Sequence, residues 1–269
     1  MNTKIRIHFI HIFEAQNSGE MLCNPYDYFP EFSEKYLCMQ HDIRNLKHSE
    51  IHKEDWVILG GGGLFEVRED FQKTINFILN KTYKVISWGC GHNQHFDHNK
   101  ILTKIKYSRF LYLATRDFCF SSNEEYCPCV SCMNPMLDIK FQEKNKIGII
   151  EHLDYPINEF EFPKIKNSAS PKNIMQFIAE SEYILSNSYH AVYWSTLMNK
   201  KVILYRPFST KFDFLKNKPI IYSGNLEDSI KKSSNYPNAL KEARKINEKF
   251  AKKVLRTIDY IENRNGEKI

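Results

Sequence analysis

The sequence predicts an α/β protein made of two Rossmann-like units with parallel sheets, followed by a long basic helix at the C-terminal end. Three observations support this fold class. Short runs rich in β-branched and aromatic residues alternate with segments of helical period along nearly the whole chain. These runs are apolar throughout, which is typical of strands buried on both faces of a parallel sheet. A length of 269 residues lies near the size at which one core divides into two domains.

The first unit covers residues 1–144 and contains a succession of strands and helices. Strands are expected at residues 4–13, 56–59, 84–88 and 110–114, and helices near residues 66–79 and 97–105. A helix between consecutive strands carries the chain back to the same end of a sheet, so this order predicts parallel pairing.

The second unit covers residues 145–269 and repeats the rhythm. Strands are expected at residues 146–151, 183–186, 202–205 and 220–223, and residues 152–169 form an irregular acidic insertion. One helix begins at Ser170 and Pro171, because a capping hydroxyl precedes a proline at the first helical position. A terminal helix over residues 236–262 has apolar residues at spacings of three and four and a basic opposite face.

The charge of the protein is concentrated in this terminal helix. The chain carries 38 Lys and Arg against 32 Asp and Glu, a net charge of +6, and residues 231–269 alone hold 11 basic and 5 acidic residues, also +6. A neutral body with one basic helix argues against a nucleic-acid partner, whose binding domain would carry a basic groove or stripe. We expect the helix to dock by its apolar stripe, with peripheral contact to an anionic membrane as the alternative.

The seven cysteines indicate a reducing compartment. An odd number cannot all pair within one chain, and residues 5–13 alternate and include His8 and His11, unlike the apolar region of a secretory signal. We therefore expect a cytoplasmic protein with free thiols. Four of the cysteines, Cys119, Cys127, Cys129 and Cys132, could supply thiolates to a metal, but their irregular spacing favours buried, reduced thiols and no metal.

The scarce glycines are concentrated at two predicted strand ends of the first unit. Six of the ten glycines lie in residues 60–91: the run Gly60, Gly61, Gly62 and Gly63 follows one strand, and Gly89 and Gly91 precede His92 and Asn93 at the end of the next. A strand running into glycines and then a helix offers bare backbone amides to a phosphate or carboxylate. The alternative is a tight turn needed for close packing.

Polar and basic residues follow other predicted strands. Arg116 and Asp117 end one strand of the first unit, where the guanidinium suits an anion or a local ion pair. In the second unit, Glu151 and His152 could act as base and orienting group. The turn Ser186, Asn187 and Ser188 precedes a helix over residues 192–199, with His190 in its first turn, and Arg206, Ser209 and Lys211 follow the next strand. These residues either converge on an anion site or only cap the helix.

These motifs, in this order, resemble the polysaccharide pyruvyl transferase family over residues 5–225. The resemblance is carried by Gly60 to Gly63 after an apolar strand, the turn at Trp88, Gly89 and Gly91, Arg116 with Asp117, the run Ser186 to His190, the strand before Pro207, Phe208 and Ser209, and an opening loop Asn17, Ser18, Gly19 and Glu20. It implies a fold similar to glycosyltransferase-B enzymes and transfer of the enolpyruvyl group of phosphoenolpyruvate to a sugar hydroxyl of a cell-surface glycan, such as a capsule or exopolysaccharide, or of a lipid-linked sugar.

The resemblance also implies roles for individual residues. His190 would protonate the methylene of phosphoenolpyruvate, and the donor would be held by Ser186, Asn187, Ser188, Arg206, Ser209, Lys211 and Arg116. The acceptor would lie on the first unit, against Asn17, Glu20, Gly61, Gly62, Gly63, His92 and Asn93. No resident cofactor is implied, since phosphoenolpyruvate enters as a substrate.

One departure from the family pattern leaves the donor open. Ser188 stands where better-studied pyruvyl transferases have an arginine, so either Arg206 or Arg116 takes its place or the donor is different. The first alternative is a glycosyltransferase of the same architecture that uses a nucleotide sugar. The second is a non-catalytic protein that binds anions or glycans.

Overall fold

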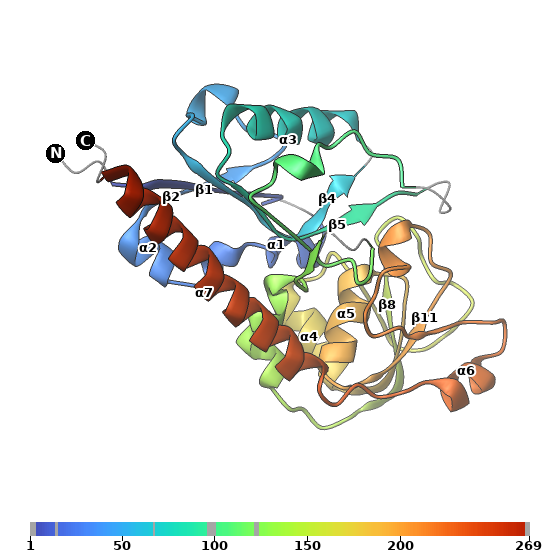
Figure 1. The fold of residues 1–269 in the computed structure, drawn as a ribbon. Coiled ribbons are helices and arrows are strands. Elements are labelled where there is room, and N and C mark those ends of the chain that lie inside the picture. The colour runs from blue at the N-terminus through green and yellow to red at the C-terminus, as the bar shows by residue number, and fades with distance from the viewer. Residues whose placement is uncertain (1–3, 14–15, 67, 96–100, 121–123, 267–269) are drawn as a thin grey trace.

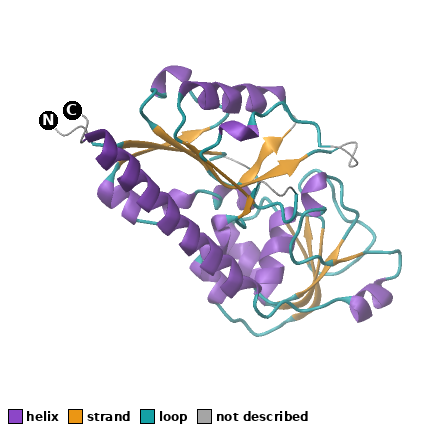
Figure 2. Cartoon of the chain, viewed as in Figure 1, coloured by secondary structure: helices purple, strands orange, loops and turns teal. Residues whose placement is uncertain are grey.

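The chain folds as an α/β protein with two parallel sheets, as the sequence predicts (Figures 1 and 2). The computed structural model describes residues 4–13, 16–66, 68–95, 101–120 and 124–266. The first sheet is built entirely from residues before position 127, and the second begins at Asn145. Each sheet has helices on both faces, which buries its central strands on both sides.

The first sheet has the strand order β2-β1-β3-β5-β6-β7, and β4 pairs with β5 outside this path. Its strands are β1 (Arg6–His11), β2 (Leu37–Asp42), β3 (Trp56–Leu59), β4 (Gly62–Glu66), β5 (Val85–Asn93), β6 (Tyr112–Thr115) and β7 (Glu125–Tyr126). The continuous apolar run of β3 is buried at every position, as expected for a central parallel strand. Helix α3 (Glu69–Lys81) covers one face through Phe71, Ile75 and Ile78.

The second sheet has the order β12-β11-β10-β8-β9. Its strands are β8 (Asn145–Glu151), β9 (Lys164–Lys166), β10 (Ser181–Ser186), β11 (Lys201–Leu204) and β12 (Ile220–Ile221). Helices α4 (Pro171–Ala179) and α5 (Tyr189–Leu197) pack on one face, and α6 (Leu226–Lys232) packs on the other. The start of α4 follows the predicted capping pattern, because Asn173 N donates to Ser170 Oγ at 3.2 Å.

Helix α7 (Ala239–Gly266) runs from the second unit back onto the first (Figure 1). Ala239 and Ala243 pack in the core of the second unit, whereas Phe250, Val254 and Ile258 pack in the core of the first unit with the short helix α2 (Glu31–Lys35). The apolar stripe is therefore used along the helix for docking. Among the helices of the described residues, none has the length and apolar character that crossing a membrane requires.

Two parts of the first unit differ from the sequence prediction. The described residues 101–105 of the expected helix over residues 97–105 are loop; the remainder of that prediction, residues 97–100, lies outside the described residues. Polar side chains explain the loop, because the amides of Leu102 and Lys104 donate to side-chain oxygens of Gln94 and Gln72. The glycine run also leads into strand β4 rather than directly into a helix.

Four short or edge strands, β2, β4, β7 and β9, were not among the predicted elements. Strand β9 lies inside the segment 152–169, which the sequence predicts to be irregular, and pairs with β8 through Ile149, Ile150 and Glu151. A strand of three residues with lysines at both ends has too little apolar pattern to be found from the sequence.

Candidate functional site

A cavity of about 200 Å³ lies where the carboxyl ends of the strands of both sheets face each other. Both sheets reverse their strand order there, at β1 and β3 in the first and at β8 and β10 in the second, and doubly wound sheets bind ligands at such points. Except for Gly63, which lies at the start of β4, the residues that line it end a strand or follow one, and they are Asn17, Glu20, Gly63, Asn93, His95, Arg116, His152, Tyr189, His190 and Lys211.

Hydrogen bonds donated by backbone amides connect the two units around the cavity. Ser18 N donates to Asn167 O at 3.1 Å, and Phe118 N donates to Phe214 O at 2.9 Å. Gln94 and Thr210 are joined twice, because Thr210 N donates to Gln94 O at 2.9 Å and Gln94 N donates to Thr210 Oγ1 at 3.0 Å. The cavity therefore lies at an interface in which the two units are hydrogen-bonded to each other.

Arg116 is the most informative residue of the cavity. Its side chain is buried, with 3% of the residue exposed, and its guanidinium lies 4.0 Å from the centre of the Tyr189 ring. Gly91 provides the space, since a Cβ there would stand 2.5 Å from Arg116 Nε. Nε and Nη1 have no hydrogen-bond partner among the described residues. Buried N–H groups on a cation are costly without an acceptor, so this position calls for an anion.

The charge of Arg116 persists despite its burial. Burial acts to lower its pKa, but Tyr189, Glu20 and Asp117 raise it, and the net result is a pKa above the ordinary value. Lys211 adds a second cation to the cavity wall, with only 8% of the residue exposed and Nζ 4.6 Å from the centre of the Phe208 ring.

His152 supplies a neutral imidazole beside these cations. Burial, and then the charge of Lys211, lower its pKa to about 4, although Asp154 acts in the opposite direction. Asp154 N donates to His152 Nδ1 at 3.2 Å, so the neutral ring carries its proton on Nε2. At pH 7 this group can donate one hydrogen bond without adding charge.

The glycine run serves the cavity by leaving room for side chains. Gly62 has φ +83°, a conformation that favours glycine, and a Cβ there would stand 2.0 Å from Glu20 Oε2. The amides of Gly60 and Gly61 do not remain bare, because they donate to Ile10 O and Cys23 O at 2.8 and 2.9 Å. Contrary to the sequence prediction, Gly60 and Gly61 therefore do not offer their amides to an anion, and Gly62 instead leaves room for the Glu20 carboxylate.

His190 lies in the first turn of α5, as expected, but next to two thiols. Its Nε2 is 3.4 Å from Cys23 Sγ and 3.6 Å from Cys129 Sγ, and the two sulfur atoms are 3.4 Å apart. Burial opposes the thiolate of Cys129, but hydrogen bonds from Cys23 and His190 lower its pKa well below the ordinary value. Burial raises the pKa of Cys23, so Cys23 is the thiol that donates.

The turn before α5 is a framework for the cavity. Ser186 Oγ donates to Ile150 O at 2.5 Å and accepts from Ser188 N at 3.0 Å. The Asn187 side chain accepts from His152 N at 2.7 Å and donates to Tyr155 O, which fixes the His152 backbone. These residues position their neighbours instead of lining the cavity.

Several other expected site residues lie outside the cavity lining. Arg206 is on the surface, with 67% of its side chain exposed, and pairs with Glu159 of the acidic insertion. Glu151 accepts from Ile157 N, and His92 is held by Asp117 and Tyr107. Gly61, Gly62 and the buried Ser209 also do not line it. Of the three expected cations, Arg116 and Lys211 therefore line the cavity and Arg206 does not.

The four cysteines considered for a metal are separated. Cys119 is exposed, and Cys127 and Cys132 are buried near Asn247, which bonds to both sulfur atoms. Within the part of the chain that the structure describes, Cys129 alone of the four lies in a group of possible metal ligands, together with Cys23 and His190.

Three residues at or beside the cavity were not singled out from the sequence. They are Cys23, His95 and Tyr189. Tyr189 is adjacent to His190 and could have been included on that ground.

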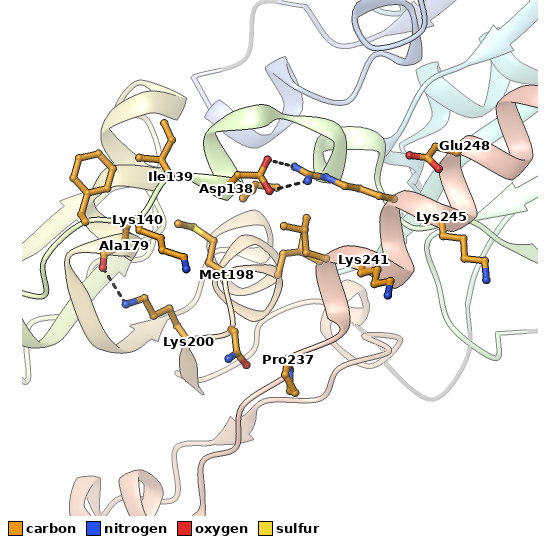
Figure 3. A pocket seen from close by; sticks show the side chains of 16 residues that line it. Asp138, Ile139, Lys140, Ala179, Met198, Lys200, Pro237, Lys241, Lys245 and Glu248 are labelled. Carbon is orange, nitrogen blue, oxygen red and sulfur yellow. Dashed lines mark hydrogen bonds and ion pairs between the residues drawn. The ribbon is translucent and has the colours of Figure 1, made fainter.

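A larger and more open groove of about 840 Å³ lies elsewhere, between the start of α7 and the second unit (Figure 3). Asp138 accepts two hydrogen bonds from the Arg244 guanidinium, both of 2.8 Å. Lys140, Lys200, Lys241 and Lys245 also line the groove. Ile139 and Phe141, on the same segment as Asp138, are exposed.

Comparison with known proteins supports the fold. No family model matches the chain, and no curated protein matches it in sequence. Among solved structures, a functionally uncharacterized protein from Klebsiella pneumoniae subsp. pneumoniae NTUH-K2044 is similar, with a TM-score of 0.54 and 13% sequence identity. The match covers 82% of this chain and 94% of that one. At this identity the likeness concerns the arrangement of the α/β elements alone.

Proposed function

We propose that the protein is a transferase of glycosyltransferase-B-like architecture that uses phosphoenolpyruvate as donor and a sugar hydroxyl as acceptor. The acceptor would belong to a cell-surface polysaccharide or a lipid-linked glycan. The observation that carries the proposal is Arg116, a buried cation whose Nε and Nη1 have no partner among the described residues, beside a second cation, Lys211, in the seam between the units. A phosphate and a carboxylate on one small donor match these two cations.

The size of the cavity favours phosphoenolpyruvate over a nucleotide sugar. Pockets that bury drug-sized ligands measure roughly 300–1,000 Å³, whereas this cavity measures about 200 Å³. A three-carbon donor fits this space, and a nucleotide diphosphate with its sugar would require the units to move apart.

The reaction needs a cation clamp and proton transfer. A sugar oxygen bonds to C2 of the donor while C3 takes up a proton, the bond from C2 to the phosphate oxygen breaks, and a second sugar oxygen completes the ketal. Of the two hydroxyl protons, one ends on C3 and the other on the departing phosphate. Arg116 and Lys211 would hold the donor, and Glu20 would accept an acceptor proton.

The resemblance assigns protonation of C3 to His190. Because His190 Nε2 faces two sulfur atoms and the neutral His152 ring can donate only a hydrogen bond, we assign this step to Glu20, which would pass the proton taken from the acceptor hydroxyl on to C3. His190 then contributes to the cavity wall and to the position of α5.

An acceptor-dependent assay tests the proposed function. Phosphoenolpyruvate and a panel of sugar acceptors should give phosphate release and a pyruvylated sugar detectable by mass spectrometry. Arg116→Gln should abolish both, and the surface variant Arg206→Gln should retain them. Sugar transfer from a nucleotide sugar in place of phosphate release would indicate the glycosyltransferase alternative. Binding of phosphoenolpyruvate without turnover of any acceptor would indicate a non-catalytic anion- or glycan-binding protein.

We also propose a cytoplasmic location with peripheral contact to the inner face of an anionic membrane through α7. The groove beside its first turns carries lysines together with exposed Ile139 and Phe141, which lie on the adjoining segment. Basic side chains beside exposed apolar ones suit an anionic lipid surface. This contact would place the cleft near a lipid-linked acceptor.

A further inference from the structure

Two thiols and one imidazole from three distant parts of the chain meet beside the cavity. Cys23 follows the short helix α1 (Ser18–Met21), Cys129 precedes the 3-10 turn of residues 130–133, and His190 belongs to α5. Both cysteines are fully buried, and His190 is 3% exposed. Their ligand atoms all lie within 4.8 Å of one another.

The separations of these atoms come within about 0.4 Å of those between the ligands of a tetrahedral zinc ion. Zn–S bonds of about 2.3 Å and Zn–N bonds of about 2.0–2.1 Å place tetrahedral ligands about 3.5–3.8 Å apart. The three observed separations are 3.4, 3.4 and 3.6 Å. The two sulfur atoms are much farther apart than the roughly 2.05 Å of a disulfide.

Neighbouring groups hold the three side chains in this arrangement. Cys23 Sγ lies 3.0 Å from Gly19 O, and Cys129 Sγ lies 3.2 Å from Ser131 Oγ. Gly19 has no side chain at the point where a Cβ would stand 1.9 Å from His190 Nδ1. The glycine therefore allows the imidazole to approach the two thiols closely.

We propose that Cys23, Cys129 and His190 form a zinc site that joins the two units. Two thiolates and a neutral imidazole balance the charge of Zn²⁺, which suits a fully buried position, and sulfur ligands disfavour Ca²⁺ and Mg²⁺. Three protein ligands leave the fourth position to water. Because two ligands come from the first unit and one from the second, the ion would tie α5 to the opposite wall of the cavity.

Zinc titration of the reduced protein tests the site. Full-length protein, stripped of metal with a chelator and kept under a phosphine reductant without oxygen, should bind one equivalent of zinc from zinc chloride. Cobalt substitution should give the intense visible bands of tetrahedral thiolate coordination. Cys23→Ser and Cys129→Ser should each weaken zinc binding by more than about 100-fold, because even outer-shell changes cost about 10–100-fold.

Matched controls separate this site from the other thiols and from the donor site. Cys127→Ser and Cys132→Ser, which alter equally buried cysteines, should keep the full zinc affinity. Arg116→Gln should also keep the zinc affinity but should lose the binding of phosphoenolpyruvate. The wild-type titration decides the question even if a variant fails to fold. The proposal is overturned if the reduced wild type binds no stoichiometric zinc, if Cys23→Ser binds it equally well, or if Cys23 and Cys129 form a disulfide that zinc does not prevent.

Discussion

The small cavity between the units and the large groove beside α7 differ in how their cations are satisfied. In the groove, Arg244 donates twice to Asp138, and Lys200 pairs with Glu143. In the cavity, Arg116 is buried and two of its N–H-bearing atoms have no acceptor within the described ranges. The groove has about four times the volume, yet its arginine already has its acceptors. A buried cation with unmet hydrogen bonds therefore locates the ligand better than the size of a hollow does.

The largest expected effect is on the affinity for phosphoenolpyruvate. Arg116→Gln should weaken binding by at least about 100-fold, since it removes charge-assisted hydrogen bonds to the donor and leaves Lys211 as the remaining cation. Lys241→Gln, in the groove, should change the affinity less than twofold. Calorimetric titration of both variants checks this contrast, and equal losses in the two would break the distinction between the regions.

Next in size is the effect of filling the space at Gly62. Gly62→Ala combines a positive φ with a clash against Glu20 and should lower the free energy of unfolding by about 2–3 kcal/mol. Gly224→Ala is the matched control, because Gly224 also has a positive φ but has open space around it, and should cost about 1 kcal/mol. Urea unfolding measures both. Similar losses would show that the Glu20 contact contributes nothing.

The cavity should also make stability depend on pH. A folded pKa of about 4 for His152, below the ordinary 6.5, means that the unfolded chain binds a proton first as the pH falls. Stability should therefore be lost between pH 6.5 and 4, by about 1–2 kcal/mol on going from pH 7 to 5 after allowance for partial solvation. His152→Asn should show a smaller loss over this range in chemical denaturation. An unchanged loss would place the titration at other buried groups, such as His11.

The smallest effect is expected in the groove. Lys245→Gln should weaken binding to vesicles of anionic lipid about fivefold, as removal of one lysine near a charged surface costs about 1 kcal/mol. Lys146→Gln, an exposed lysine of the second unit paired with Glu182, should have no effect. Vesicle co-sedimentation at low and high salt provides the measurement. Equal binding by the wild type, Lys245→Gln and Lys146→Gln would contradict the proposed membrane contact.

The sequence predicts the sheets better than the site because strand patterns are local. The apolar run of residues 56–59 and the capped start of α4 needed no information from elsewhere in the chain. Edge strands such as β2 and β9 were missed because partial exposure weakens the apolar pattern.

The site depends on how the two units pack, which no local pattern records. The rule that ligands meet strand ends correctly brings Arg116, Lys211 and His152 to one cavity, because it follows from parallel topology. The same rule does not predict that Arg206 pairs with Glu159 at the surface, because that contact depends on the path of the acidic insertion over residues 152–169. The meeting of Cys23 with Cys129 spans 106 positions and crosses several elements.

Calorimetric titration of the wild-type protein with phosphoenolpyruvate, and separately with UDP-, CMP- and GDP-sugars, tests most directly the claim that the cavity binds phosphoenolpyruvate. We expect one phosphoenolpyruvate per chain and no saturable heat from the nucleotide sugars. Saturable binding of a nucleotide sugar, with no heat from phosphoenolpyruvate, would contradict the proposed donor.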